Sequence, residues 1–249
     1  MRSTLSRHRL SRRAVALAVL LGATGALAHG GPPPVDLWTS GQGGYDTYRI
    51  PSLVKTETGA LLAFCEGRKA GGGDTGDIDL LMRRSTDAGR TWSPTQVVWD
   101  DGENTSGNPC PVVDRKTGAI LLLATHNLGV DHESEIIAGA SQGTRTVWLL
   151  RSTDDGQSWS RPENITKNTK KPDWTWYATG PGHGIQLETG RLIIPCDFGT
   201  GEPDPDHEFF GSHVIYSDDH GETWQIGGTL LGQLNECQVV ELSDGKLLL

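Results

Sequence analysis

The sequence predicts an all-β protein built from the blades of a propeller. One eight-residue pattern occurs three times, at residues 85–92, 152–159 and 217–224. The copies begin 67 and then 65 residues apart, and this spacing fits a four-stranded blade with a long loop better than a short solenoid repeat. The 33 glycines and 13 prolines separate short apolar segments, which favours many short strands over long helices.

Each copy of the pattern, called an Asp box below, has the chemistry of a hairpin turn. In the first copy, Asp87 and Gly89 lie two residues apart between an apolar run and Trp92. We expect the aspartate to accept backbone N–H groups of the turn and the glycine to adopt a positive φ angle. The tryptophan can then fold back between strands, where its ring buries roughly 150–250 Å². The Asp boxes are therefore predicted to be structural.

Short apolar runs mark the expected strands, and most of them follow a Thr-Gly or Asp-Gly turn. Examples lie at residues 50–54, 60–64, 119–123, 191–194 and 246–249. Because the chain ends inside the last of these runs, we expect a propeller domain at residues 38–249 that is incomplete at its C-terminus and contains roughly four blades.

The first 28 residues have the features of a secretory signal peptide. Five arginines precede the apolar stretch 14–21, and Ala26-Leu27-Ala28 offers a small-residue cleavage site. A membrane anchor would need about 20 uninterrupted apolar residues, whereas glycine and threonine interrupt this stretch at 22–25. Residues 29–37 are then a linker, and we expect a secreted or periplasmic protein without stable membrane insertion. The pair Arg12-Arg13 leaves twin-arginine export open.

Composition excludes several kinds of partner and cofactor. Without the predicted signal peptide the formal net charge falls from −9 to −14, so nucleic acid is not an expected partner. The four cysteines permit three disulfide pairings, but they lie inside apolar runs, so free buried thiols are an open alternative. Since the sequence has no CxxC motif and no histidine cluster, no metal or other cofactor is predicted.

A second set of segments is not required by the repeat architecture. These segments are Tyr48-Arg-Ile-Pro51, Glu66-Gly-Arg68, the glycine-rich stretch 71–79 and Asn235-Glu-Cys-Gln-Val-Val-Glu241. In this order, and together with the Asp boxes, they resemble the exo-α-sialidases (neuraminidases) of bacteria and animals over residues 38–249. The resemblance implies a six-bladed β-propeller that removes terminal α-linked sialic acids from glycoproteins, glycolipids or oligosaccharides, with retention of configuration and without a cofactor.

The resemblance gives roles to two arginines. Sialic acid carries a carboxylate on its anomeric carbon, and planar guanidinium groups bind carboxylates in a bidentate manner. Arg49 is the predicted clamp for this carboxylate, and Arg68 is predicted to line the pocket. Taken alone, the residue types also allow Arg49 to be a surface residue and Arg68 to form an ion pair with Glu66.

Two acidic residues complete the predicted site. Glycoside hydrolysis needs an acid that protonates the leaving oxygen; Asp74 matches the acid/base position of the family, with Asp77 and Asp79 as rivals on spacing alone. Sialidases use a tyrosine nucleophile, because a neutral phenol avoids the charge repulsion that a carboxylate would meet. Glu236 matches the glutamate that activates this tyrosine in the family, and Glu241 is its rival.

The sequence departs from the family pattern in its tyrosines. None of the four, at positions 45, 48, 177 and 216, has the context of the nucleophile. We therefore expect this tyrosine and two further arginines to lie beyond residue 249, and the fragment to be inactive alone.

Other residues near these motifs have more than one role open to them. Trp176 and Tyr177 are candidates for the wall beside the acyl or glycerol group of the sugar, and packing between blades explains them equally well. His183, between two glycines, favours a structural role. The acidic segment 131–135 either rims the pocket or forms a solvated loop.

The main alternative function is a non-catalytic propeller of the Asp-box type, used for glycan binding or assembly. A third hypothesis is a propeller hydrolase that acts on another acidic sugar. The non-catalytic alternative gives no reason for Arg49, Arg68 and Asp74 to lie together in the fold.

Overall fold

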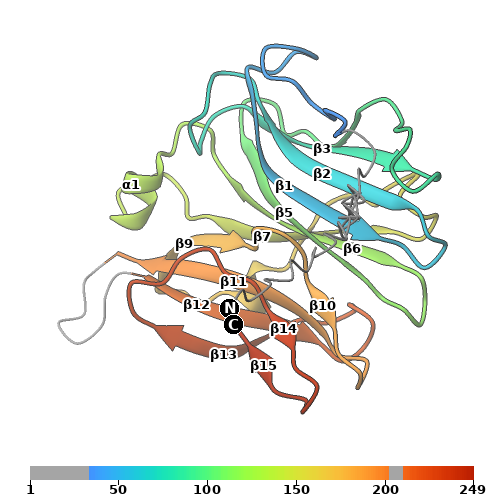
Figure 1. Ribbon diagram of the computed structural model, residues 1–249. Coiled ribbons are helices and arrows are strands. Elements are labelled where there is room, and N and C mark those ends of the chain that lie inside the picture. Colours follow the sequence, from blue (N-terminus) through green and yellow to red (C-terminus); the bar gives the residue numbers. More distant parts are fainter. Residues whose placement is uncertain (1–33, 202–209) are drawn as a thin grey trace, which may run out of the picture. The chain divides into compact units, whose positions relative to one another are not determined.

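Antiparallel strands build three blades and begin a fourth (Figure 1). The computed structural model describes residues 34–201 and 210–249, of which 36–249 belong to one unit. This part of the chain contains fifteen strands and two short helices. The prediction of an all-β propeller fold is therefore confirmed. The predicted signal peptide and residues 29–33 of the predicted linker lie outside the described residues.

The first two blades have the same plan, four antiparallel strands in chain order. The first blade consists of β1 Thr47–Lys55, β2 Leu61–Arg68, β3 Ile78–Ser85 and β4 Gln96–Trp99. The second consists of β5 Thr105–Val113, β6 Ile120–Asn127, β7 Thr146–Ser152 and β8 Glu163–Asn164. The helices α1 Glu133–Ile137 and α2 Thr166–Thr169 lie between β6 and β7 and after β8.

The third blade has an interrupted first strand. β9 Trp174–Thr179 and β10 Ile185–Gln186 both pair with β11 Leu192–Thr200, and β12 Phe210–Ser217 and β13 Gln225–Leu231 complete this blade. The fourth blade begins with the pair β14 Val240–Glu241 and β15 Leu247–Leu248. The strands predicted from the five apolar runs correspond to β1, β2, β6, β11 and β15.

The second strand of each blade is a nearly continuous apolar run because both of its faces are covered. Along β6, Leu121 and Leu123 belong to a core cluster shared with the third blade, whereas Leu122 and Ala124 belong to a cluster shared with the first. Successive side chains of a strand point to opposite faces. One strand therefore contributes to two cores between blades.

The three Asp boxes form the same turn. In the first, Asp87 Oδ1 accepts the backbone N–H of Thr91 at 2.8 Å, and the Ser85 hydroxyl oxygen accepts the N–H of Gly89 at 2.9 Å. Gly89 has a φ of +82° and Ala88 before it +60°, as in a type I′ turn. The equivalent acceptors in the other boxes are Asp154 with Ser152 and Asp219 with Ser217. The predicted turn chemistry is confirmed.

The Asp boxes also join neighbouring blades. Gly156 of the second box packs against β2 of the first blade, where a Cβ atom on this glycine would lie 2.8 Å from Leu62 Cδ1. Arg84, near the end of β3, donates to the backbone oxygen of Asp155 at 2.8 Å and forms an ion pair with its carboxylate. Each Asp box therefore closes its own turn, and the second box also attaches the second blade to the first.

The tryptophans that end the second and third boxes fold back, as predicted. Trp224 is 2% exposed, and its indole N–H donates to the Gly221 oxygen at 3.1 Å. Trp159 packs edge-on against Phe64 of the first blade, with ring centroids 5.8 Å apart.

The cysteines are free thiols, which answers the question that the sequence left open. Cys65, Cys110 and Cys196 are buried, and Cys237 is partly buried. Burial raises the pKa of the Cys110 thiol, so this residue behaves as a small apolar side chain.

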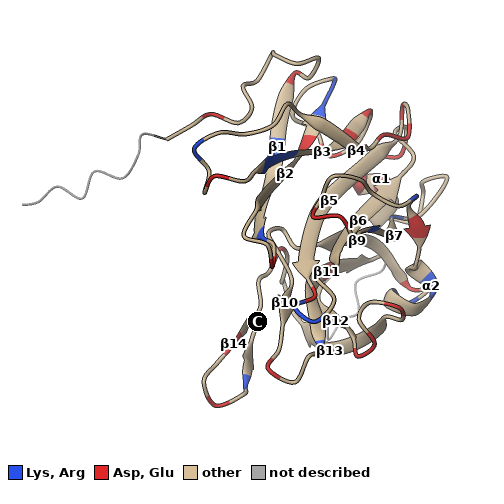
Figure 2. Cartoon of the chain, turned by 90° about the vertical axis from the view of Figure 1, so that its right-hand side faces the viewer, with Lys and Arg blue, Asp and Glu red and all other residues tan. Residues whose placement is uncertain are grey.

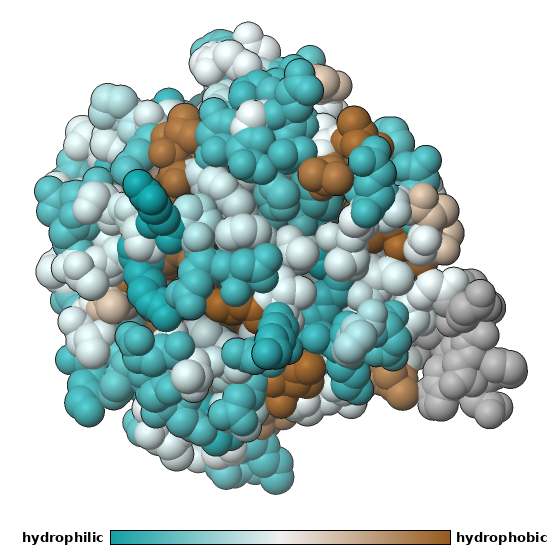
Figure 3. Space-filling model, turned by 180° about the vertical axis from the view of Figure 1, so that it is seen from behind, coloured by the Kyte–Doolittle hydropathy of each residue, from teal (hydrophilic) through white to brown (hydrophobic). Residues whose placement is uncertain are grey.

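Polar and charged residues dominate the parts of the surface that Figures 2 and 3 show. Many charged residues lie in turns and at strand ends (Figure 2), and the face seen in Figure 3 is mostly hydrophilic with several separate apolar patches. Within residues 34–201 and 210–249, no helix has the length and apolar character needed to cross a membrane.

Candidate active site

One pocket of about 160 Å³ collects most of the residues that the sequence singled out. It lies beside the first strands β1, β5 and β9, which contact one another in that order. The residues that line it are Arg49, Ile50, Glu66, Arg68, Asp74, Asn108, Glu133, Arg145, Trp176, Ala178, Asn235 and Glu236. Five of the six predicted site residues are in this set, and Tyr177 is not.

Asp74 is held between the two predicted arginines. Its Oδ1 atom accepts hydrogen bonds of 2.8 Å from Arg49 Nη1 and from Arg68 Nη1. Arg49 and Asp74 keep 43% of their side-chain surface exposed, whereas Arg68 keeps only 3%. Both arginines also donate to the backbone oxygen of Gly72 in the glycine-rich loop. Arg68 therefore anchors the loop from below, and Arg49 faces the opening.

Glu66 fixes Arg68 and the neighbouring blade at once. Its Oε2 atom accepts from Arg68 Nε at 2.9 Å, and its Oε1 atom accepts the backbone N–H of Asn108 at 2.7 Å. A Cβ atom on Gly107 would lie 2.7 Å from Glu66 Oε1, so a glycine is required for this approach. The sequence offered an ion pair with Glu66 and a place in the pocket wall as alternatives for Arg68. The structure shows both.

A β-bulge lies beside the pocket residues in the first strand of two blades, β1 and β5. The pairing register shifts after Arg49 in β1 and after Gly107 in β5. The next residues, Ile50 and Asn108, have φ angles of +53° and +51°. A positive φ is a strained conformation for a β-branched residue such as isoleucine. Bulges re-aim the side chains beside them, and the residues at these two bulges, Arg49, Ile50 and Asn108, all line the pocket.

Glu236 reaches the same pocket from the segment before β14. Its neighbours hold it in place: Asn235 O accepts from the Ser212 hydroxyl at 2.8 Å, and Cys237 N–H donates to Gly180 O at 3.3 Å. The segment that leads into the fourth blade therefore brings a carboxylate to residues of the first blade.

The rival acids lie elsewhere. Asp79 is buried, accepts from the Tyr45 hydroxyl at 2.7 Å, and shares Lys69 with Asp77. Glu241 accepts the backbone N–H of Glu188 at 3.0 Å. None of the three rivals lines the pocket.

Tyr177 does not line the pocket, in contrast to one of the two roles proposed for it. Its side chain is fully buried in the core between the second and third blades, and its hydroxyl donates to Thr169 O at 3.3 Å. Trp176, the preceding residue of β9, does line the pocket. Because neighbouring side chains of a strand point to opposite faces, only one of the pair can reach it.

Arg145 is a pocket residue that the sequence did not reveal. It lies just before β7, 3% exposed, and its guanidinium carbon stacks 4.0 Å from the centroid of the Trp176 ring. Burial lowers its pKa, while Glu66 and Asp197 act in the opposite direction. In the sequence, Arg145 is only a basic residue at the start of an apolar run. Basic residues are common at strand ends, so this position does not indicate a pocket residue.

Two further acids surround Arg145. Glu133 of α1 lines the pocket, and its pKa is raised by burial and by Asp74 while Arg145 lowers it. The sequence left two roles open for the acidic segment 131–135, a pocket rim or a solvated loop. Glu133 takes the first of these roles, because it lines the pocket. Asp197 of β11 is buried and lies opposite Ala178 in the pairing of β11 with β9, and burial raises its pKa to about 7, against the effect of Arg145.

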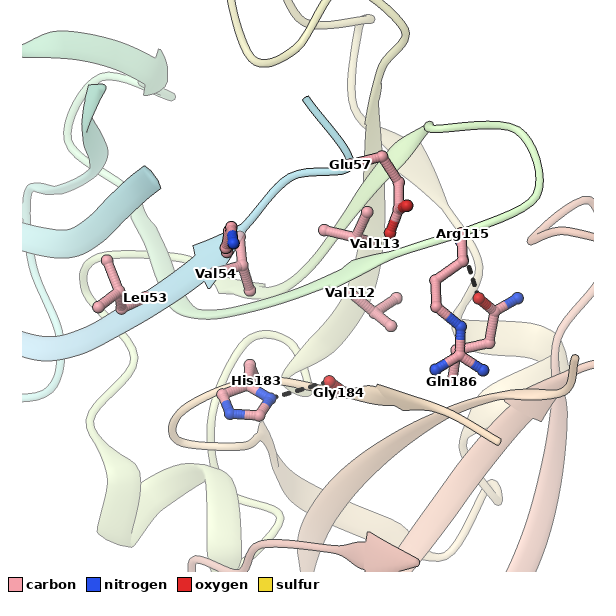
Figure 4. A pocket seen from close by; sticks show the side chains of 10 residues that line it. Leu53, Val54, Glu57, Val112, Val113, Arg115, His183, Gly184 and Gln186 are labelled. Carbon is pink, nitrogen blue, oxygen red and sulfur yellow. Dashed lines mark hydrogen bonds between the residues drawn. The ribbon is translucent and has the colours of Figure 1, made fainter. Parts of the chain in front are cut away.

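A second hollow, of about 280 Å³, lies at the other ends of the same first strands (Figure 4). Some of its polar groups are already paired: Gln186 Oε1 accepts the N–H of Arg115 at 2.8 Å, and His183 Nδ1 lies 2.9 Å from Gly184 O. None of the predicted site residues lines this hollow. Of these two hollows, the first is therefore the one that collects the predicted site residues.

The first pocket combines cationic and acidic groups without a metal site. Its guanidinium groups suit a bound anion, and its carboxyl groups suit proton transfer. Within the described ranges no group of three His, Cys, Asp or Glu side chains is arranged to hold a metal ion.

Known proteins resemble this chain in sequence and in structure. The model of the BNR repeat-like domain family matches residues 59–249. An exo-alpha-sialidase of Aspergillus fumigatus is 34% identical over 82% of this chain and 51% of its own length, and a sialidase of Micromonospora viridifaciens is 36% identical over 95% and 39%. The solved structure of the Hadza microbial sialidase Hz136 aligns with a TM-score of 0.71 at 35% identity, over 79% of this chain and 40% of its own.

The chain spans about half the length, or less, of the curated relatives it matches. The family match nevertheless covers most of the chain, including all three Asp boxes. The blades, the boxes and these relatives agree, and the chain belongs to the sialidase family of BNR repeat-like proteins.

Proposed function

We propose that the whole protein is a retaining exo-α-sialidase, a glycoside hydrolase that removes terminal α-linked sialic acids from glycoproteins, glycolipids or oligosaccharides. One observation carries this proposal: Asp74 and Glu236 share a pocket with Arg49 and Arg68, although they are far apart in the sequence. A non-catalytic propeller gives no reason for this convergence. The sialidases among its relatives support the same reaction class.

In this proposal Arg49 binds the carboxylate of the sugar, and Arg68 supports the buried part of the pocket wall next to Arg49. The guanidinium of Arg49 is partly exposed, so it can meet a ligand, whereas that of Arg68 is engaged with Glu66 and with the glycine-rich loop. The protein as a whole is acidic. Attraction of an anionic sugar therefore depends on these local guanidinium groups, which act within about a Debye length.

Asp74 serves as the acid and base. Its Oδ1 atom is bound by both Arg49 and Arg68, so in this arrangement it is not free to meet a leaving oxygen. We infer that the incoming sugar carboxylate takes the place of Asp74 at Arg49, so that Asp74 is released, takes up a proton and delivers it to the leaving oxygen. The glycines at 71–73 and 76 give this loop the freedom to move.

Glu236 acts as the base that activates a tyrosine nucleophile. None of the tyrosines at 45, 48, 177 and 216, all of which lie in the described ranges, lines the pocket. The expectation that the nucleophile lies beyond residue 249 stays a prediction, and so does the inactivity of the fragment alone.

The test is hydrolysis of a fluorogenic aryl α-sialoside by the whole protein, with an Asp74→Ala variant as control. We expect turnover by the natural protein, α-sialic acid as the first product in proton NMR, and a large loss in the variant. A folded protein that cleaves no sialoside would refute the proposal. Cleavage of an aryl glucuronide instead would favour a hydrolase of another acidic sugar.

We also propose that the protein acts outside the cytoplasm, because its first 28 residues have the pattern of a signal peptide. N-terminal sequencing of the mature protein should begin after Ala28. A mature protein that retains Met1 would contradict this.

A further inference from the structure

We propose that Arg145 is a specificity-determining residue, which binds a neutral acceptor oxygen of the sugar: either the carbonyl of its N-acyl group or a hydroxyl of its glycerol chain. This inference rests on the proposed sialidase function and extends it to the part of the pocket wall formed by Arg145 and Trp176.

The guanidinium of Arg145 has donors to offer. It lines the pocket and is 3% exposed, yet among the described residues it forms no ion pair and no hydrogen bond, and its Nε atom is fully buried without a partner. A guanidinium carries five N–H donors, and a donor that is buried without a partner, as Nε is here, is costly. A ligand oxygen in the pocket would satisfy them.

Arg145 is also held rigidly in place. Its backbone N–H donates to Thr175 O at 3.3 Å, and its own oxygen accepts from Lys170 Nζ at 2.5 Å. Lys170 donates to Thr175 O as well, at 3.1 Å, so it ties the start of β7 to β9. The guanidinium then stacks on Trp176, the next residue of β9. A donor group fixed by its neighbours selects ligands better than a mobile one.

The charges around Arg145 favour a neutral partner. Four carboxyl groups act on it, from β2, from β11, from α1 and from the glycine-rich loop. They are Glu66, Asp197, Glu133 and Asp74. Those of the four that are ionised attract Arg145 and would repel a second anion in this part of the pocket. A carbonyl or hydroxyl oxygen meets no such repulsion, and the sugar carboxylate has Arg49.

Space near the guanidinium is kept open by a glycine. A Cβ atom on Gly107 of β5 would lie 3.4 Å from Arg145 Nη2, closer than most side-chain contacts. The bulge of β5 follows this residue. The first strand of the second blade therefore leaves room for the donor face of Arg145.

The experiment compares three aryl α-glycosides on the whole protein and its Arg145→Lys variant. One substrate is the N-acetylated sialoside, the second has a hydroxyl in place of the N-acyl group, and the third has a shortened glycerol chain. Lysine keeps the charge but loses the planar fork. For the intact sialoside we expect kcat/KM to fall about 10- to 100-fold, mainly through a higher KM.

The loss should shrink to within about twofold on the analogue that lacks the group bound by Arg145. A smaller loss on the second substrate identifies the N-acyl carbonyl, and a smaller loss on the third identifies the glycerol chain. Equal losses on all three substrates, or no loss on the intact sialoside, would overturn the proposal. If the natural protein cleaves no sialoside at all, the proposed function fails instead.

Arg151→Lys is the matched control, because Arg151 lies in the same strand β7, donates to Gly221 O at 2.7 Å and does not line the pocket. Its kinetics should stay unchanged. If the Arg145→Lys protein does not melt cooperatively, NMR of arginine-labelled natural protein replaces it. The intact sugar should shift one buried Nε–H signal more than the matching shortened sugar does, and equal shifts would refute the assignment.

Discussion

Arg49 donates a hydrogen bond of 2.8 Å to Asp74, so the predicted carboxylate clamp and the predicted acid are paired with each other. Arg68 donates to the same oxygen of Asp74 at 2.8 Å. Asp74 stays bonded to both arginines until another anion competes for the guanidinium groups. Binding of the sugar and readiness of the acid are therefore coupled in the proposed mechanism.

Replacing Asp74 with asparagine should reveal its role through the leaving group. Asparagine fills the same space but cannot donate an acidic proton. We expect kcat/KM for a sialyl-oligosaccharide to fall about 10²- to 10⁴-fold, and kcat/KM for an aryl sialoside with a good leaving group to fall much less. Steady-state kinetics on the two substrates measures the difference.

Asp77→Asn is the control for this experiment. Asp77 is three residues away and pairs with Lys69 at 2.7 Å, outside the pocket. Its variant should keep the natural activity on both substrates. Equal losses on the two substrates with Asp74→Asn would argue against its role as the acid.

Replacing Glu236 with glutamine should give a different kinetic pattern. A base that activates the nucleophile is needed before the leaving group departs, so both substrate types should lose about 10²- to 10⁴-fold in kcat/KM. Glu241→Gln serves as the comparison, since Glu241 contacts the Glu188 backbone and not the pocket. An active Glu236→Gln enzyme would exclude Glu236 as the base.

A glycine in the second Asp box should matter for stability because of the neighbouring blade. Gly156 has a φ of +81° and no room for a Cβ atom beside Leu62, whereas Gly118 has a φ of +74° and open space. Gly118→Ala should cost about 1–2 kcal/mol for its left-handed backbone. Gly156→Ala should cost about 1–3 kcal/mol more because of crowding between blades.

Urea unfolding of the two glycine variants measures this difference. If they lose the same free energy of unfolding, the contact between the second Asp box and Leu62 contributes nothing to the attachment of the blades.

Asp197 should make stability depend on pH. Burial raises its pKa to about 7, with Arg145 opposing and Glu236 adding to the rise. The folded protein therefore keeps a proton that the unfolded chain releases near its ordinary pKa. The stabilising contribution is fully present below about pH 4 and is lost as pH rises through about 7.

An Asp197→Asn variant keeps the neutral form at every pH. Relative to it, the natural protein should lose free energy of unfolding between pH 5 and pH 8, on the order of a few kcal/mol. Urea unfolding of both proteins across this range gives the difference between their free energies of unfolding. The contributions of all other titrating groups cancel in this difference. Parallel pH profiles would show that Asp197 titrates near its ordinary pKa.

The parts of the fold that sequence analysis predicted correctly are local. In each Asp box the acceptor and the turn it closes lie within about four residues, so the pattern alone predicts the hydrogen bonds. The left-handed residue before each box glycine was not predicted, because Ala88 shows no preference for that conformation. Its φ is imposed by the turn on both sides.

The residues Arg49, Arg68, Asp74 and Glu236 were named from motifs, yet the motifs do not bring them together. Their meeting depends on the contact of β1, β5 and β9 and on the segment before β14. The choice of Asp74 over Asp79 came from family resemblance, and the pocket position agrees with it because Asp79 is buried under Tyr45.

By itself, the sequence determined the repeated turns, the short apolar strands and the residue types suited to an anionic sugar, since each of these depends on neighbours along the chain. Only the tertiary structure decided that Trp176 faces the pocket and Tyr177 the core, and that Arg145 enters the pocket wall with no hydrogen bond from its guanidinium to any described residue. The physical reason is that strand alternation sets which side chains oppose each other, whereas the packing of adjacent blades decides which of the two faces is buried.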